Sequence, residues 1–236
     1  MPFVPVLHAE WLKIRTLRSL VGALAAILLV TVGFSAVTSA HPDHSDALFS
    51  VFFGVSLGQI AAIAFGALAV AGEYRGGALR LTLTAAPDRT RWFAAKAVAV
   101  ALPVFAAGLV TGLLTLAVGR ANLGADAPPW GDGLRGALGS ALYLTLMALL
   151  AAGLAAVLRS GVTTLGLLIP FLLIVSFVIG DLSAGAADYL PDRAGQIALH
   201  STWDGTLGPW SGLAVTALWS AAALFAGAWC VRRRDA

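Results

Sequence analysis

Residues 136–180 read GALGSALYLTLMALLAAGLAAVLRSGVTTLGLLIPFLLIVSFVIG and carry one charged side chain, Arg159. A transmembrane helix needs about 20 mostly apolar residues, because each residue adds about 1.5 Å and the hydrocarbon core is about 30 Å thick. The stretch is therefore too long for one span and predicts two antiparallel helices joined by a tight turn at Arg159. Its apolar residues are continuous instead of alternating, which favours helices over a β-barrel.

The composition excludes most other classes of protein. Of the 236 residues, 59% are hydrophobic and 11% are charged, and the mean hydropathy is +0.87. Soluble domains carry about 25% charged residues, and disordered chains are rich in charge. A disulfide-stabilised secreted domain is excluded because Cys230 is the only cysteine. We therefore predict an all-α polytopic membrane protein with a single transmembrane domain over residues 1–236.

Charge-free runs of sufficient length predict six transmembrane helices. Their approximate ranges are 19–40, 47–72, 97–119, 136–158, 160–180 and 205–231. Pro170 is expected to kink the fifth span. None of the six runs contains Asp, Glu, Lys, Arg or His, which argues against an ion-driven carrier, because such carriers keep charged groups at membrane depth.

The connections between these spans predict the orientation of the chain. Twelve of the 15 Lys and Arg residues lie in the N-terminal segment, the 73–96 connection, the Arg159 turn and the C-terminal segment. The opposite side collects eight aspartates. By the positive-inside rule we expect both termini to be cytoplasmic. We expect the membrane to be the plasma membrane. The net charge of +3 is an orientation signal and does not support a nucleic-acid partner.

The N-terminal segment is predicted to form an amphipathic helix. Leu7, Trp11 and Ile14 recur at helical spacing, whereas Glu10 and Lys13 occupy another face. Such a helix can lie in the cytoplasmic interface, in contact with membrane lipid, before the chain enters the first span. A basic flank that only orients the first span is the alternative.

The longest cytoplasmic connection, residues 73–96, reads EYRGGALRLTLTAAPDRTRWFAAK. It carries five positive charges and an apolar alternation of three leucines, namely Arg75, Arg80, Arg89, Arg91, Lys96, Leu79, Leu81 and Leu83. The alternation has no partner strand, so a short amphipathic helix that ends before Pro87 is expected. A basic loop that serves only orientation is the alternative.

Two outer connections contain features that need an interpretation. The 41–46 loop, HPDHSD, holds two His and two Asp, but a metal site needs three or four converging ligands, so an ordinary loop is favoured and no metal or cofactor is expected. Residues 181–204 mix apolar residues with Asp and Gly. This pattern predicts a re-entrant-like connection whose short helices dip into the outer leaflet.

Together these features resemble the ABC-2-type membrane permeases of ATP-binding-cassette exporters, particularly their short actinobacterial form. The resemblance covers the whole chain: an N-terminal segment ending LKIRTLRS, six spans with both ends inside, and a long last outer connection. Its most specific part is Glu73-Tyr74-Arg75 with Gly77, the run RLTLTA at 80–85, Pro87, Arg89 and Ala95-Lys96. The family often has Gly-Thr-Ile or Gly-Thr-Leu where this chain has Gly77-Ala78-Leu79.

The resemblance implies that a separate ATP-binding-cassette ATPase docks on the 73–96 segment and drives the permease. The ATPase-coupling residues would be Glu73, Arg75, Gly77, Leu79, Leu81, Leu83, Pro87, Arg89 and Lys96. It further implies a second permease chain, identical or related, a non-catalytic role for this chain, and export of the substrate. The uncharged spans suit a hydrophobic or amphipathic substrate.

Two other classes of function remain open at this stage. An intramembrane enzyme acting on lipid or peptide would need converging catalytic groups at membrane depth. Ser56 lies in a G-x-S-x-G sequence, but all four histidines lie outside the spans, so helix packing explains that motif better. A membrane assembly protein without transport would show the same spans and the same basic connection.

Overall fold

The computed structural model describes residues 3–41, 46–75, 78–85, 88–175, 178, 185, 187–203 and 205–233, apart from the side chains of residues 80, 81, 83, 85 and 175. Within these residues the chain is helical and contains no strand. The helices are α1 (Phe3–Thr16), α2 (Arg18–Ala40), α3 (Ala47–Phe52), α4 (Val55–Ala71), α5 (Ala78–Ala85), α6 (Arg89–Leu123), α7 (Trp130–Leu158), α8 (Gly161–Pro170), α10 (Pro191–Gln196) and α11 (Pro209–Arg233).

Five helical segments of the described chain are long and apolar enough to cross a membrane. They are α2, Ala47–Tyr74, Arg89–Asp126, α7 and α11. This confirms the predicted class, an all-α multi-pass membrane protein. The predicted span at 160–180 begins as α8 and continues after Pro170 as a π-helical turn, Phe171–Val175, but most of its remainder lies outside the described residues. The count of six spans therefore stays a prediction.

The turn predicted at Arg159 is confirmed. The helix α7 ends at Leu158 and α8 begins at Gly161. Between them Arg159 adopts a left-handed backbone conformation with φ of 56°, and its N–H donates to the carbonyl of Ala155. A left-handed residue at this position is a common way to end a helix, although glycine usually occupies it.

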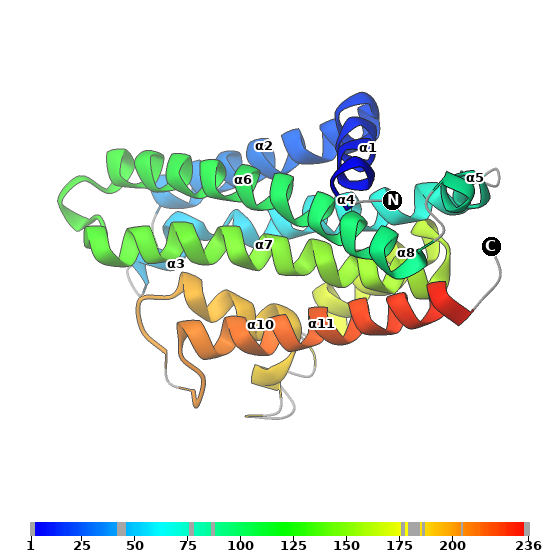
Figure 1. Cartoon of the computed structure of the whole chain (residues 1–236). Coiled ribbons are helices and arrows are strands. Elements are labelled where there is room, and N and C mark those ends of the chain that lie inside the picture. Colours follow the sequence, from blue (N-terminus) through cyan, green and yellow to red (C-terminus); the bar gives the residue numbers. More distant parts are fainter. Residues whose placement is uncertain are drawn as a thin grey trace.

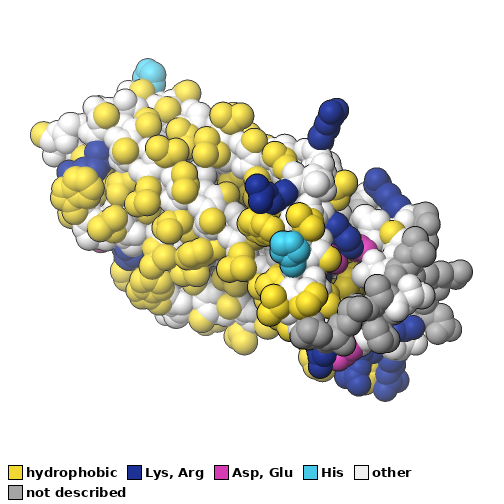
Figure 2. All heavy atoms as spheres, turned by 45° about the horizontal axis from the view of Figure 1, so that its top comes forward, with side chains coloured by type: hydrophobic (Ala, Val, Ile, Leu, Met, Phe, Trp, Pro, Cys, Tyr) yellow, Lys and Arg dark blue, Asp and Glu magenta, His cyan; other side chains and the backbone are white. Residues whose placement is uncertain are grey.

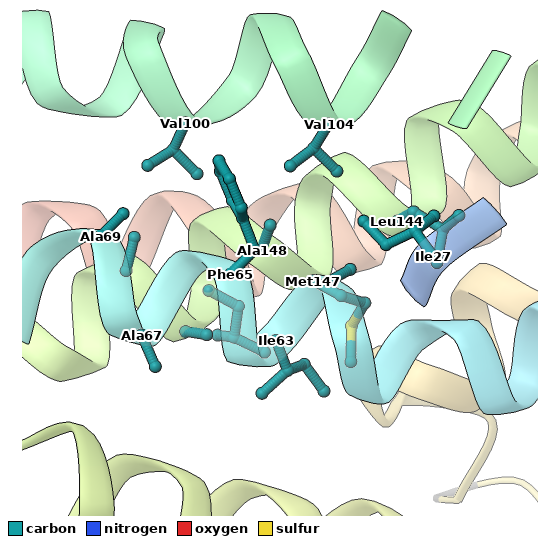
Figure 3. Packing of buried hydrophobic residues seen from close by; sticks show 14 of the residues in the cluster. Ile27, Ile63, Phe65, Ala67, Ala69, Val100, Val104, Leu144, Met147 and Ala148 are labelled. Atoms are coloured by element: carbon teal, nitrogen blue, oxygen red, sulfur yellow. The ribbon is translucent and has the colours of Figure 1, made fainter. Parts of the chain in front are cut away.

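The core lies where α4, α6 and α7 pack together. Phe65 of α4, Val100 and Val104 of α6, and Met147 of α7 are fully buried in one hydrophobic cluster, and Figure 3 shows the two valines pointing from α6 towards α4 and α7. The backbones of α4 and α7 also approach closely, because a Cβ added to Gly66 would lie 1.9 Å from the carbonyl oxygen of Ala148. In a membrane no hydrophobic driving force brings helices together. Small residues of this kind let two helices pack at short range, and the resulting van der Waals contacts stabilise their association.

The outer helices of the bundle expose apolar side chains. Leu29 of α2 and Phe225 of α11 are 68% and 73% exposed. Exposed side chains of this kind suit contact with lipid tails, which are as apolar as the side chains themselves. Figure 2, in which the upper side of Figure 1 faces the reader, shows hydrophobic side chains over most of the surface and most of the visible Lys and Arg side chains towards one end.

That end of the bundle carries α1, α5, the start of α6 and the end of α11 (Figure 1). The helix α6 begins at Arg89, earlier than the span predicted from residue 97, because the carboxylate of Asp88 accepts a hydrogen bond from the Arg91 N–H and caps the helix. Residues 89–96 thus form about two turns of α6. The described part of the 73–96 connection contains a helix, α5, and no strand.

Candidate functional site

A group of buried charges joins α1 to both ends of the 73–96 segment. Lys96 donates from Nζ to Glu73 Oε1 at 2.7 Å and also to Glu10 Oε2. Lys13 donates to Glu73 Oε1 at 2.8 Å and to Glu10 Oε1 at 3.0 Å. We call these four residues the charge cluster. Two carboxylates and two ammonium groups leave it with no net charge.

Two neutral donors complete the hydrogen bonding of the charge cluster. The indole Nε1 of Trp92 donates to Glu10 Oε1 at 3.3 Å, and the hydroxyl of Thr82 on α5 donates to Glu73 Oε2 at 3.2 Å. Every carboxylate oxygen of the charge cluster therefore accepts at least one hydrogen bond. A buried ion pair is tolerated only where its remaining lone pairs are satisfied in this way.

The charge cluster is largely buried, so removing one of its charges would be costly. The side chains of Glu10, Glu73 and Lys96 are 3%, 6% and 4% exposed. Only Lys13 reaches solvent, with 36% of its side chain exposed. Burial disfavours the charged ammonium of Lys13, but its hydrogen bond to Glu73 and the charges of Glu10 and Glu73 outweigh burial and raise the pKa of Lys13 above its ordinary value.

The structure describes several other predicted coupling residues. Leu79 is buried in the core, whereas Arg75 is exposed. Arg89 donates from Nη1 to the carbonyl of Val231 at 3.0 Å and so joins the start of α6 to the end of α11. Gly77 and Pro87, and the side chains of Leu81 and Leu83, lie outside what the structure describes.

The N-terminal segment forms the helix α1, and its Glu10 contacts Trp92 and Lys96 of α6. Ile14 is buried, Leu7 is half-buried and Trp11 is 37% exposed. Glu10, however, is not on a solvent-facing surface: it is 2% exposed and points into the charge cluster. A carboxylate can be buried here because Lys96 of α6, far away in the sequence, supplies the opposite charge. Glu10 and Lys13 were therefore missed as site residues.

A second contact brings the Arg159 turn to the same segment. The guanidinium of Arg159 lies 5.6 Å from the centre of the Tyr74 ring, and the Tyr74 hydroxyl donates to the carbonyl of Ala156 at 3.4 Å. Cation–π contacts of this kind stabilise by about 0.5–1 kcal/mol at exposed sites. The Arg159 turn thus lies directly against Tyr74, near the start of the 73–96 segment.

At the other end of the bundle, Asp46 forms hydrogen bonds with two residues of the last outer connection. It caps α3 by accepting from the Phe49 N–H, and its carboxylate also meets His200 Nδ1 at 2.9 Å and the backbone N–H and hydroxyl of Ser201. Burial opposes ionisation of Asp46, but these hydrogen bonds outweigh it and lower its pKa. The described residues contain no group of three metal-ligating side chains, and residues 42–45 of the predicted loop lie outside them.

Polar side chains also meet inside the bundle. The Tyr143 hydroxyl donates to Gln59 Oε1 and accepts from Gln196 Nε2 at 3.3 Å, and Gln196 Oε1 accepts from the Ser56 hydroxyl at 3.2 Å. This network ties α10, in the last outer connection, to α4 and α7. The Ser56 hydroxyl is thus bonded to an amide oxygen, and close packing explains the neighbouring Gly58, whose added Cβ would lie 2.0 Å from Thr31 Oγ1.

Comparison with known sequences gives one match. Residues 19–235 match the family model DUF2705, whose description is "Protein of unknown function". The match includes Glu73, Trp92 and Lys96 of the site, whereas Glu10 and Lys13 precede it. No curated protein matches the chain.

Proposed function

Because the chain belongs to the DUF2705 family, whose description assigns no function, we propose a function from its own residues: it is the permease subunit of an ATP-binding-cassette transporter. A separate ATPase docks on the 73–96 segment, and two permease chains form the transport pathway in the plasma membrane, with both termini of each chain in the cytoplasm. The substrate is hydrophobic or amphipathic and is exported.

The charge cluster is the observation that carries this proposal. Glu73 and Lys96 are the two ends of the proposed docking segment, and both are bound to α1 through Glu10 and Lys13. A displacement of α5 moves Glu73, whose carboxylate Thr82 of α5 also contacts. The ion pairs then transmit the displacement to α6 and α1, and α1 leads directly into α2.

Because these contacts are buried, we expect the 73–96 segment to adopt two distinct positions. A buried ion cannot leave its partner without a large desolvation cost, so intermediate positions of the segment are disfavoured. A transport switch of this kind needs different contacts in its two conformations. The ion pairs of the charge cluster are expected to act together: all four residues keep their partners, or all four exchange them.

A crosslinking experiment tests where the ATPase docks. A photo-crosslinking amino acid is placed at Thr84, an exposed residue of α5, and as a matched control at Ala121, an exposed residue near the other end of α6. The chain is expressed together with a P-loop ATPase taken from the same genome. We expect a crosslinked product from Thr84 and none from Ala121; crosslinking from Ala121 alone would contradict the docking site.

A second experiment separates a permease from an assembly protein. Glu73→Gln should weaken transmission from the docked ATPase, so ATP-driven transport falls while ATPase binding persists. Arg120→Gln serves as control, because Arg120 lies at the far end of α6 and contacts the Pro128 carbonyl and the Trp130 ring. An ATPase that binds the unmodified chain without any ATP-driven transport would favour the assembly protein instead.

A further inference from the structure

A cavity of about 590 Å³ lies beside the charge cluster, between α1, the start of α2, the end of α4 and α5. Charged side chains, hydroxyl-bearing side chains and leucines all line it. The cavity forms where α1 meets α2 at Leu17, the one non-helical residue between them. In Figure 1, α1 stands at an angle to α2, which runs along the bundle.

The charged lining has an excess of positive charge. It contains Lys13, Lys96 and Arg75 against Glu10 and Glu73. The two lysines and the two glutamates neutralise one another in the charge cluster, which leaves Arg75, an exposed residue, as the surplus cation. Among the described residues Arg75 has no carboxylate within ion-pair distance. About a third of the Lys13 side chain is also exposed. The cavity therefore suits an anion that lies next to Arg75 and Lys13.

The remaining lining suits an acyl chain. Leu17 is 50% exposed, Leu20 is buried and Leu68 of α4 is half-buried, and all three line the cavity. Leu20 and Leu68 belong to helices that are long and apolar enough to cross a membrane. The cavity therefore combines the cationic side chains of Lys13 and Arg75 with apolar side chains of two membrane-spanning helices.

We propose that this cavity binds one anionic phospholipid from the leaflet on which α1 lies. The phosphate contacts Arg75 and Lys13, the hydroxyl of Ser19 hydrogen-bonds the headgroup, and an acyl chain follows the leucines. Basic pockets between transmembrane helices on the positively charged side of a membrane protein are suited to anionic headgroups. This site goes beyond the proposed transport function and requires neither an ATPase nor a substrate.

Native mass spectrometry of the purified chain tests the proposal directly. The chain is exchanged into nanodiscs of phosphatidylcholine mixed with phosphatidylglycerol and then released, and the lipids retained per chain are identified. We expect one phosphatidylglycerol to be retained in preference to phosphatidylcholine. Arg75→Gln should weaken this retention about fivefold, as expected for the loss of one cation near an anionic surface, and Arg75→Lys should restore most of it.

Arg233→Gln is the matched control. Arg233 is an exposed cation at the same end of the bundle, but it stacks on Trp229 at 3.9 Å and does not line the cavity. Equal retention of the two lipids, or an equal loss in Arg75→Gln and Arg233→Gln, would overturn the proposal. Inorganic phosphate added at matched concentration distinguishes the source of the anion. If phosphate alone displaces the retained lipid, the site binds a free anion and the proposed lipid site is wrong.

Discussion

Replacing Lys96 by methionine tests the charge cluster most directly. Methionine is unbranched and one atom shorter than lysine, and it removes the ammonium that contacts Glu10 and Glu73. Both carboxylates stay buried, at 3% and 6% exposure, and would then share the single ammonium of Lys13. Breaking a buried ion pair by removing one partner costs about 3–5 kcal/mol, because it leaves an uncompensated buried charge. We expect the free energy of unfolding to fall by that amount.

The assay is equilibrium unfolding by SDS in mixed micelles, followed by circular dichroism. Arg91→Met is the matched control on the same helix, because the ion pair of Arg91 with Asp88 has side chains that are 46% and 52% exposed. Exposed ion pairs contribute about 0.2–1 kcal/mol. A cost for Lys96→Met as small as that for Arg91→Met would refute the reasoning, since it would mean that the carboxylates are solvated or neutral.

A double-mutant cycle sharpens the test. Glu73→Gln in the Lys96→Met background removes one of the two stranded carboxylates and restores charge balance between Glu10 and Lys13. The double variant should therefore be more stable than the sum of the two single losses, by about 0.5–3 kcal/mol, the usual range for directly contacting residues. Additive losses would indicate that Glu73 and Lys96 do not interact as their distance of 2.7 Å implies.

Three further outcomes are expected. The pKa of Asp46 is lower in the folded protein than its ordinary value of 3.8, so ionised Asp46 stabilises the fold above pH 3.8. This stability is lost as the pH falls through the lower folded pKa. Thermal melting from pH 6 to about pH 3 should therefore show a smaller acid-dependent loss in Asp46→Asn than in the unmodified chain. Tyr143→Phe removes two buried hydrogen bonds to glutamine side chains and should lower the free energy of unfolding by about 1–3 kcal/mol, measured by SDS titration; no loss would contradict the network. Gly66→Ala should reduce the yield of folded protein in size-exclusion chromatography, because its Cβ would lie 1.9 Å from the Ala148 carbonyl oxygen, whereas Gly22→Ala, with open space around it, should not.

The candidate site could be predicted only in part. Glu73 and Lys96 were identified through a family resemblance that marks the ends of one connection, and the structure brings them together. Glu10 and Lys13 were assigned to another face of the N-terminal helix, because a charged residue in a helical pattern is equally compatible with solvent and with a buried partner. The partner of Glu10, Lys96, is 86 residues away, and no local pattern connects the two.

The amino-acid sequence by itself determined the all-α membrane class and the turn at Arg159, because hydrocarbon thickness and helical rise convert the length of a charge-free run into a number of spans. The helix start at Arg89 was also encoded locally, by the Asp88 cap, and was missed. Only the tertiary structure decided which charges are buried and where the cavity beside them lies. Burial of a charge depends on the opposite charges that folding brings next to it, and this proximity is set by the packing of α1 against α6, not by the residues on either helix alone.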